Sequence, residues 1–154
     1  MNRRRALLGT LTLGTLILGA CARGVPERPR VELTLVGGPG LKQPLAVRIY
    51  QLVATEHFLA APPPALLGHE QATLGTDDLG MEEILLRPGE TRHLERRWRE
   101  QAKSIGVSVL YDTSSGGLWR DVAALAHDGP SRFRLEVEPG RTRLRPLRQG
   151  EKSV

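Results

Sequence analysis

Histidine side chains are the first candidates for acid–base or metal chemistry, because their charge changes near neutral pH and their ring nitrogens bind metals. The chain carries four histidines and a single cysteine among its 154 residues. No two histidines stand at a ligand spacing such as HxxxH, and the cysteine is far from all of them. The pattern therefore predicts no metal site. We expect solvated or edge histidines at all four positions, which are His57, His69, His93 and His127.

Adjacent acids and a glycine-flanked serine pair are the other residues that suggest catalysis. Neighbouring residues of a strand point to opposite faces, so Glu82–Glu83 make a poor acid–base pair. Asp77–Asp78 are expected to accept loop or cap hydrogen bonds, and Ser114–Ser115 lack the GxSxG pattern of a nucleophile elbow. Trp119 is expected in the core rather than as a binding handle. The sequence predicts that the protein is not an enzyme and needs no metal or cofactor.

The lone Cys21 stands where a long apolar run ends. Arginines at positions 3–5 precede fifteen uncharged residues, 6–20, which is the layout of an export signal. The run is short for a membrane-spanning helix, which needs about 20 apolar residues. Its last residues, Leu18-Gly19-Ala20, resemble the lipobox at which bacterial lipoproteins are cleaved and acylated. The alternative is an ordinary signal peptide followed by a chance cysteine.

Lipidation would give the cysteine a physical role as an anchor. Each buried methylene of an acyl chain contributes about 0.8 kcal/mol, and two or more chains suffice for stable membrane attachment. The residues that follow, "ARGVPERPR", combine proline, glycine and arginine as a tether does. We expect a signal peptide over residues 1–20 and a lipidated N-terminus with its tether over residues 21–30. Arg4–Arg5 leave twin-arginine export open, although the remaining sequence favours the general secretory route.

Charge and length limit the partners of the mature chain. The whole sequence has 22 basic and 17 acidic residues. Removal of residues 1–20 takes away three arginines and no acids, which leaves 134 residues with 19 basic and 17 acidic side chains, a net charge of +2. This balance and the export signal argue against a nucleic-acid partner. A chain of this length forms one domain, and without a cysteine pair it must be stabilised by packing alone.

The mature chain reads as a series of short strands separated by turns. Strict alternation and branched apolar residues predict strands over 31–36, 45–52, 81–86, 91–96, 105–111, 118–125, 131–138 and 141–147. No βαβ alternation interrupts the series, so we expect an all-β antiparallel sandwich over residues 31–147 and a flexible tail over 148–154. The expected core residues are Val47, Ile49, Val107, Val109, Phe133 and Leu135.

Two segments depart from the simple strand pattern. Residues 55–79 hold three consecutive prolines and break the period, so they are expected to form an irregular insertion with short helices near 56–60 and 64–67. The last two strands form a hairpin that pairs Glu138 with Arg141 and Glu136 with Arg143. Such cross-strand pairs explain the arginine-rich C-terminus without any ligand.

The order of several stretches resembles one known family. The strand "VELTL" is followed by a glycine loop and "PLAVRIYQL", and Phe58 opens an insertion that ends in "LGTDDL". The stretches "LLRPGE", "SIGVSVLYD" and "LWR" then follow. Over residues 31–145, together with the lipobox, this arrangement resembles TssJ, the outer-membrane lipoprotein family of the bacterial type VI secretion system.

The resemblance implies a fold, a location and a partner. The fold would be a transthyretin-like sandwich of two β-sheets with a small helical insertion. The protein would carry lipid, such as palmitate, on Cys21 and sit on the periplasmic face of the outer membrane. Ala22 agrees with that destination, because an aspartate there would signal inner-membrane retention. The partner would be the periplasmic C-terminal region of TssM, an inner-membrane protein, bound through the loop between the first two strands.

That loop corresponds to residues 37–44 of this chain. It begins Gly37-Gly38-Pro39, where members of the family often have an Asn-Pro-like start. Leu41 has no periodic reason to be buried, and Lys42 and Gln43 place a charge and donors beside it. We therefore expect partner binding at Gly38, Leu41, Lys42 and Gln43. The alternative is a plain connector with Leu41 folded back onto the sandwich.

Two other functions remain open at this point. A different envelope lipoprotein with a sandwich fold would bind a small ligand in a pocket lined by convergent polar groups. A periplasmic hydrolase would assemble its ionisable groups in a cleft from residues distant in sequence.

Overall fold

The computed structural model describes residues 27–110, 119–148 and 150–151. The expected signal peptide, Cys21, most of the tether and Ser114–Ser115 lie outside the described residues, as does most of the expected C-terminal tail. Within the described parts no helix is long and apolar enough to cross a membrane.

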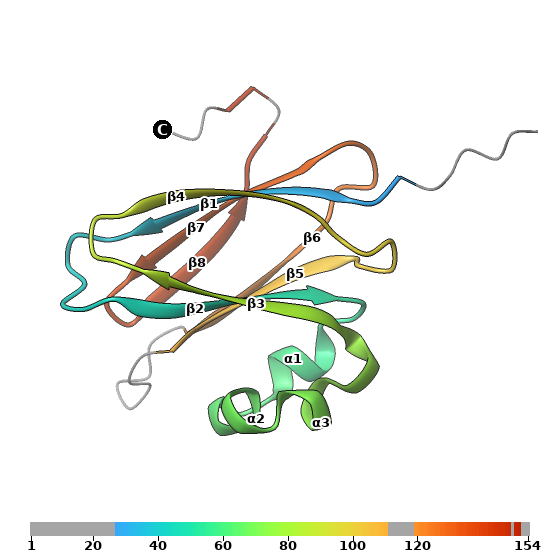
Figure 1. Cartoon of the computed structure of the whole chain (residues 1–154), viewed down its shortest axis with the longest axis horizontal. Helices are drawn as coiled ribbons and strands as arrows, with labels where there is room; N and C mark the ends of the chain where they lie inside the picture. Colours follow the sequence, from blue (N-terminus) through green and yellow to red (C-terminus); the bar gives the residue numbers. More distant parts are fainter. Residues whose placement is uncertain (1–26, 111–118, 149, 152–154) are drawn as a thin grey trace, which may run out of the picture.

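Two four-stranded sheets form the body of the protein (Figure 1). Sheet A has the order β4 (Thr91–Arg97), β1 (Arg30–Gly37), β7 (Ser131–Glu138) and β8 (Arg141–Pro146). Sheet B has the order β3 (Asp78–Leu86), β2 (Leu45–Leu52), β5 (Ser104–Leu110) and β6 (Arg120–Ala124). The two-sheet sandwich expected from the sequence is confirmed.

One strand pair runs against the expectation of a purely antiparallel fold. β1 and β7 are parallel neighbours in the middle of sheet A, with Leu33 opposite Phe133. A parallel pair needs a long crossover connection, and here five strands intervene between β1 and β7, namely the four of sheet B and β4 at the edge of sheet A. Alternation along each strand shows which face is buried but not the direction of a partner so far away in sequence.

The sandwich core forms where the inner faces of the two sheets meet. On β1 the alternate residues Val31, Leu33 and Leu35 are almost fully buried. Full burial of such a side chain contributes about 1.5–3 kcal/mol. All six core residues expected from the sequence are buried, namely Val47, Ile49, Val107, Val109, Phe133 and Leu135. Every described residue of this core lies between Val31 and Leu144.

The insertion between β2 and β3 contains more helix than expected. It forms α1 (Glu56–Ala60), α2 (Pro63–Gly68), α3 (Glu70–Leu74) and a 3₁₀ turn, η1 (Gly75–Asp77). The sequence predicted only two helices. The additional helix, α3, is a single short turn, and the residue before it, His69, makes no side-chain cap that would mark a helix start. Proline occupies the first turn of α2, where its missing N–H costs nothing.

The helices cover the outer face of sheet B (Figure 1). β2 has apolar residues on both faces because its outer face, through Tyr50 and Leu52, packs against Phe58 and two leucines of α2 and α3 in a second core cluster. The rings of Tyr50 and Phe58 lie 5.0 Å apart. Sheet B is therefore buried on both sides, and the molecule has three layers.

Candidate partner-binding surface

The loop between β1 and β2 carries the chain from sheet A to sheet B at one end of the sandwich (Figure 1). It opens with a tight turn in which the backbone N–H of Leu41 donates to the carbonyl oxygen of Gly38 at 3.2 Å. Pro39 suits the second position of such a turn, since its ring fixes the backbone angle there.

Two neighbouring turns hold the start of this loop in place. The N–H of Gly37 donates to the Glu90 carbonyl at 2.8 Å, and the N–H of Gly38 donates to the Val137 carbonyl at 2.8 Å. A Cβ atom at position 37 would lie 2.2 Å from the Arg87 carbonyl oxygen, so only glycine fits there. The β1–β2 loop, the β3–β4 turn and the β7–β8 turn thus form one surface, which we call the loop end: residues 37–44, 87–90 and 138–141.

Leu41 is buried, although the sequence pattern shows no periodic reason for burial and leads to the expectation that its side chain contacts a partner. Its side chain is 7% exposed and belongs to the sandwich core, which is the arrangement of the alternative, with Leu41 folded back onto the sandwich. Gly38 is also buried, against the backbone of Val137. Lys42 and Gln43 are exposed, so they are the two expected contact residues with side chains available to a partner.

An apolar hollow of about 280 Å³ lies beside the loop. Leu41 and Leu45 form part of its wall, and the β7–β8 turn closes it with Pro139 and Gly140. The sequence marked Pro139–Gly140 only as a turn, because nothing local shows that it packs beside a loop almost a hundred residues earlier. The hollow combines a fixed apolar surface with the exposed side chain of Lys42.

The β3–β4 turn that buttresses the loop is organised by Glu90. Its carboxylate accepts a hydrogen bond from the backbone N–H of Arg87 at 2.8 Å and pairs with the Arg92 guanidinium at 2.6 Å. These interactions with Arg87 and Arg92 hold the pKa of the Glu90 carboxyl below its usual value.

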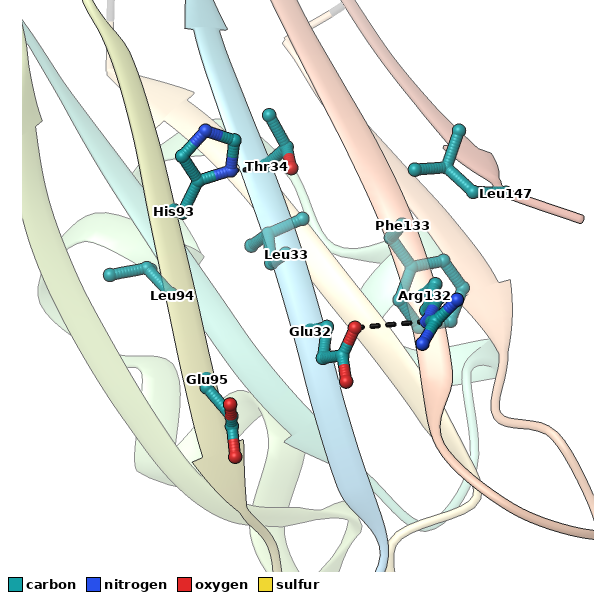
Figure 2. A pocket seen from close by; sticks show the side chains of 9 residues that line it. All are labelled: Glu32, Leu33, Thr34, His93, Leu94, Glu95, Arg132, Phe133 and Leu147. Carbon is teal, nitrogen blue, oxygen red and sulfur yellow. Dashed lines mark hydrogen bonds and ion pairs between the residues drawn. The ribbon is translucent and has the colours of Figure 1, made fainter. Parts of the chain in front are cut away.

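A second hollow, of about 210 Å³, lies on the outer face of sheet A (Figure 2). Thr34 and His93 are direct cross-strand neighbours and share a hydrogen bond of 3.0 Å between Oγ1 and Nδ1. Glu32 and Arg132 are likewise opposite each other and form an ion pair of 2.9 Å. These polar groups pair with each other across the strands, as sheet-stabilising residues do. Both hollows are smaller than the usual 300–1,000 Å³ of a small-molecule pocket.

The remaining residues considered from the sequence either pair with neighbouring side chains and backbone groups or are exposed. His57 pairs with Asp77 at 2.6 Å, and Asp78 accepts a hydrogen bond from the Gly80 N–H, as expected of a loop acid. Glu82 and Glu83 point to opposite faces and pair with different arginines. Exposed His69 and His127 complete the set. Within the described ranges, no three His, Cys, Asp or Glu residues are grouped as a metal site requires.

Trp119 and Arg120 join the helical insertion to sheet B. Trp119 packs half-buried against the second core cluster, so it is a packing residue at the edge of the core. The guanidinium of Arg120 lies 4.7 Å from the Trp119 ring and donates to the carbonyl oxygens of Phe58, at 2.7 Å, and Ala61. Burial lowers the pKa of Arg120. This arginine satisfies carbonyls at the end of α1, a need that sequence patterns do not reveal.

Known proteins share both the sequence pattern and the fold. Residues 36–140 match the family model of the type VI secretion lipoproteins VasD, EvfM and TssJ. The T6SS lipoprotein TssJ1 of Pseudomonas aeruginosa has a similar structure, with a TM-score of 0.74 and 29% identity over 79% of this chain and 98% of that chain. Lip of Serratia marcescens, a membrane-bound component of the type VI secretion system, gives a TM-score of 0.68 and 20% identity over 77% and 97% of the two chains.

A chain from a solved type VI membrane complex shares the same fold, with a TM-score of 0.62 and 23% identity over 79% of this chain and 100% of that chain. No protein with a curated function matches the sequence.

Proposed function

The chain belongs to the type VI secretion lipoprotein family, and from this premise we propose that it anchors the secretion system's membrane complex to the outer membrane. The anchor is lipid on Cys21, and the partner is the periplasmic C-terminal region of TssM. The observation that carries the proposal is the loop end, where a loop is fixed by two further turns and exposes Lys42 and Gln43 beside an apolar hollow.

The layout of the sandwich supports this division of roles. The expected tether leads into β1 at Arg30, and the β1–β2 loop lies at the other end of that strand. Eight residues of β1 separate the two ends by roughly 25 Å. A domain anchored through its N-terminus therefore presents the loop end away from its point of attachment. Recognition residues are commonly placed on loops that a rigid scaffold positions in this way.

Binding is tested with the chain shortened to residues 22–154, which retains the complete described core. Lys42→Glu combined with Gln43→Ala changes the two exposed loop side chains and leaves Leu41 in the core. We expect the affinity for the periplasmic region of TssM to fall at least tenfold, about 1.4 kcal/mol, with an unchanged melting temperature. Isothermal titration calorimetry provides the affinity.

The matched control is Lys103→Glu with Gln101→Ala, two exposed residues at the opposite end of the sandwich. It makes the same chemical changes and is expected to bind like the wild type. Equal affinity of both double variants and the wild type would remove the loop from the interface.

The anchor is tested separately by replacing Cys21 with Ser in the full chain. Without a thiol to acylate, the protein should leave the outer-membrane fraction and appear with soluble periplasmic proteins. Metabolic labelling with an alkyne fatty acid should mark the wild type and not the variant. A variant that still sediments with outer membranes in cells lacking TssM would show that acylation is not the anchor.

A further inference from the structure

The β7–β8 hairpin carries an unusual number of arginines on its outer face. Inward alternation of the apolar residues leaves Arg132 and Arg134 outward on β7, and Arg141, Arg143 and Arg145 outward on β8. From the sequence alone, these arginines are expected to pair with glutamates across the strands. The register of that hairpin is as expected, with Glu138 opposite Arg141 and Glu136 opposite Arg143.

The expected ion pairs do not form in this register. Glu136 pairs instead with Arg134 on its own strand at 2.9 Å. Arg145, the last arginine of β8, pairs with Glu151 at 2.9 Å. Among the described residues, no carboxylate lies within ion-pair distance of Arg141 or Arg143, although both side chains are exposed.

These two arginines adjoin the loop end. Arg141 directly follows Gly140, which closes the apolar hollow beside Leu41. Arg141 and Arg143, together with Glu136 and Glu138, also line a narrow depression of about 70 Å³ on the outer face of the hairpin. The depression and the apolar hollow therefore meet at the β7–β8 turn.

Charge at this end of the molecule is one-sided. Glu90 pairs with Arg92, and Glu136, which faces Arg143, pairs with Arg134. Among the acids of residues 37–44, 87–90 and 136–143, Glu138 is therefore the one that makes no ion pair with any described residue. Opposite it stand four exposed cations that make no ion pair with any described residue: Lys42, Arg87, Arg141 and Arg143. A guanidinium without an ion-pair partner can donate two parallel hydrogen bonds to a carboxylate, and the positive field of the four cations attracts an acidic partner before contact.

We infer that the loop end binds an acidic protein segment whose carboxylates pair with Arg141 and Arg143 while an apolar side chain enters the hollow beside Leu41. The inference rests on the proposed function, because it describes the chemistry of the TssM segment that would dock there. It adds the β7–β8 hairpin to the β1–β2 loop as a determinant of recognition.

The test compares Arg141→Glu/Arg143→Glu with the control Arg99→Glu/Lys103→Glu in the chain of residues 22–154. Arg99 and Lys103 are exposed at the opposite end, so the control has a nearly identical change in charge. At low ionic strength we expect the hairpin variant to bind the periplasmic region of TssM at least tenfold more weakly than the control. The difference should shrink as salt is raised toward about 1 M, where the screening length falls to about 3 Å.

The outcomes separate this inference from the proposed function. If the hairpin variant binds like its control while Lys42→Glu/Gln43→Ala weakens binding, the acidic-segment inference is wrong and the proposed function stands. If the wild type does not bind TssM, the proposed function fails, and immobilised poly-glutamate then decides the inference. The inference is supported if the hairpin variant loses poly-glutamate binding and the Arg99→Glu/Lys103→Glu control retains it. Equal retention by the hairpin variant and this control would overturn the inference.

A membrane surface is the competing occupant of this arginine face. Co-sedimentation with vesicles of phosphatidylglycerol and phosphatidylethanolamine measures that contact directly on the non-acylated chain. Equal, weak sedimentation of the wild type and the hairpin variant is expected. Strong sedimentation that Arg141→Glu/Arg143→Glu abolishes would assign the face to lipid and overturn the inference of a protein partner.

Discussion

At the scale of single residues, the loop end depends on side chains and backbone groups that each satisfy a neighbour. Gly37 leaves room for the Arg87 carbonyl, and Leu41 closes the core beneath the exposed Lys42. Glu90 links the N–H of Arg87 to the guanidinium of Arg92. The shape of the loop thus depends on the β3–β4 turn that it touches.

Glu90 makes this dependence testable through pH. Because the pKa of Glu90 is lowered by Arg87 and Arg92 from its usual 4.5, its charge stabilises the folded state above that value. The stabilisation is lost as the pH falls through the lower pKa of the folded state. We expect Glu90→Gln to reduce the urea midpoint at pH 7, and the difference from wild type to vanish in strong acid, where both side chains are neutral.

Glu138→Gln is the control, since the side chain of Glu138 is exposed and makes no hydrogen bond or ion pair with any described residue. Its urea midpoint should follow the wild type at every pH. A Glu90→Gln difference that persists unchanged into acid would show that the carboxylate charge is not the cause.

At the scale of elements, the helical insertion is a third layer that sheet B requires. β2 and β5 bury both faces, and the helices exclude water from the outer one. Arg48 strengthens this contact, since its guanidinium on β2 reaches the Leu66 carbonyl at 2.9 Å and the carboxylates of Glu70 and Glu83. Gly106 on β5 provides the space into which Leu52 and Phe58 pack.

Gly106→Ala is expected to destabilise the fold by about 1–3 kcal/mol through overpacking. The added Cβ would lie 2.7 Å from a methyl of Leu52 and 3.2 Å from the Phe58 ring, and both side chains are fully buried. Urea unfolding measures the loss. Gly68→Ala, at the end of α2 with nothing within 4 Å, should be neutral or stabilise by about 0.5–1 kcal/mol. Equal stability of the two variants would contradict close packing of the insertion on β5.

At the scale of the whole molecule, the sandwich separates the end where β1 begins, which we propose is the anchor end, from the loop end. Strand β1 begins at the former and ends at the latter, where the β3–β4 and β7–β8 turns lie beside the β1–β2 loop (Figure 1). With this polarity, the sandwich would transmit a contact at the loop end to the proposed lipid anchor at the other end without any change in its own shape.

Site-specific labelling in permeabilised cells tests this orientation. In the acylated protein Cys21 carries lipid, so a thiol introduced at another position is the single reactive one. Lys42→Cys and Arg99→Cys place it on exposed positions at opposite ends. Co-production of TssM should protect the thiol at position 42 from a maleimide reagent and leave that at position 99 reactive. Protection at position 99 alone would place the partner at the anchor end.

The sequence by itself determined the layered β architecture, because alternation along a strand reports locally which side chains are buried. The sequence was sufficient to predict the six core residues, the two-sided burial of β2, the register of the β7–β8 hairpin and the loop at 37–44. Alternation along the strands and short-range turn chemistry specify these features without reference to distant parts of the chain.

Only the tertiary structure decided how remote segments meet. The parallel pairing of β1 and β7, the burial of Leu41 and the apolar hollow closed by Pro139 all depend on contacts between residues a hundred or so positions apart. The same holds for Glu136, which faces Arg143 in register yet pairs with Arg134. Exposed ion pairs differ by less than about 1 kcal/mol, so the choice among them follows the local geometry of the folded surface, which a one-dimensional pattern does not contain.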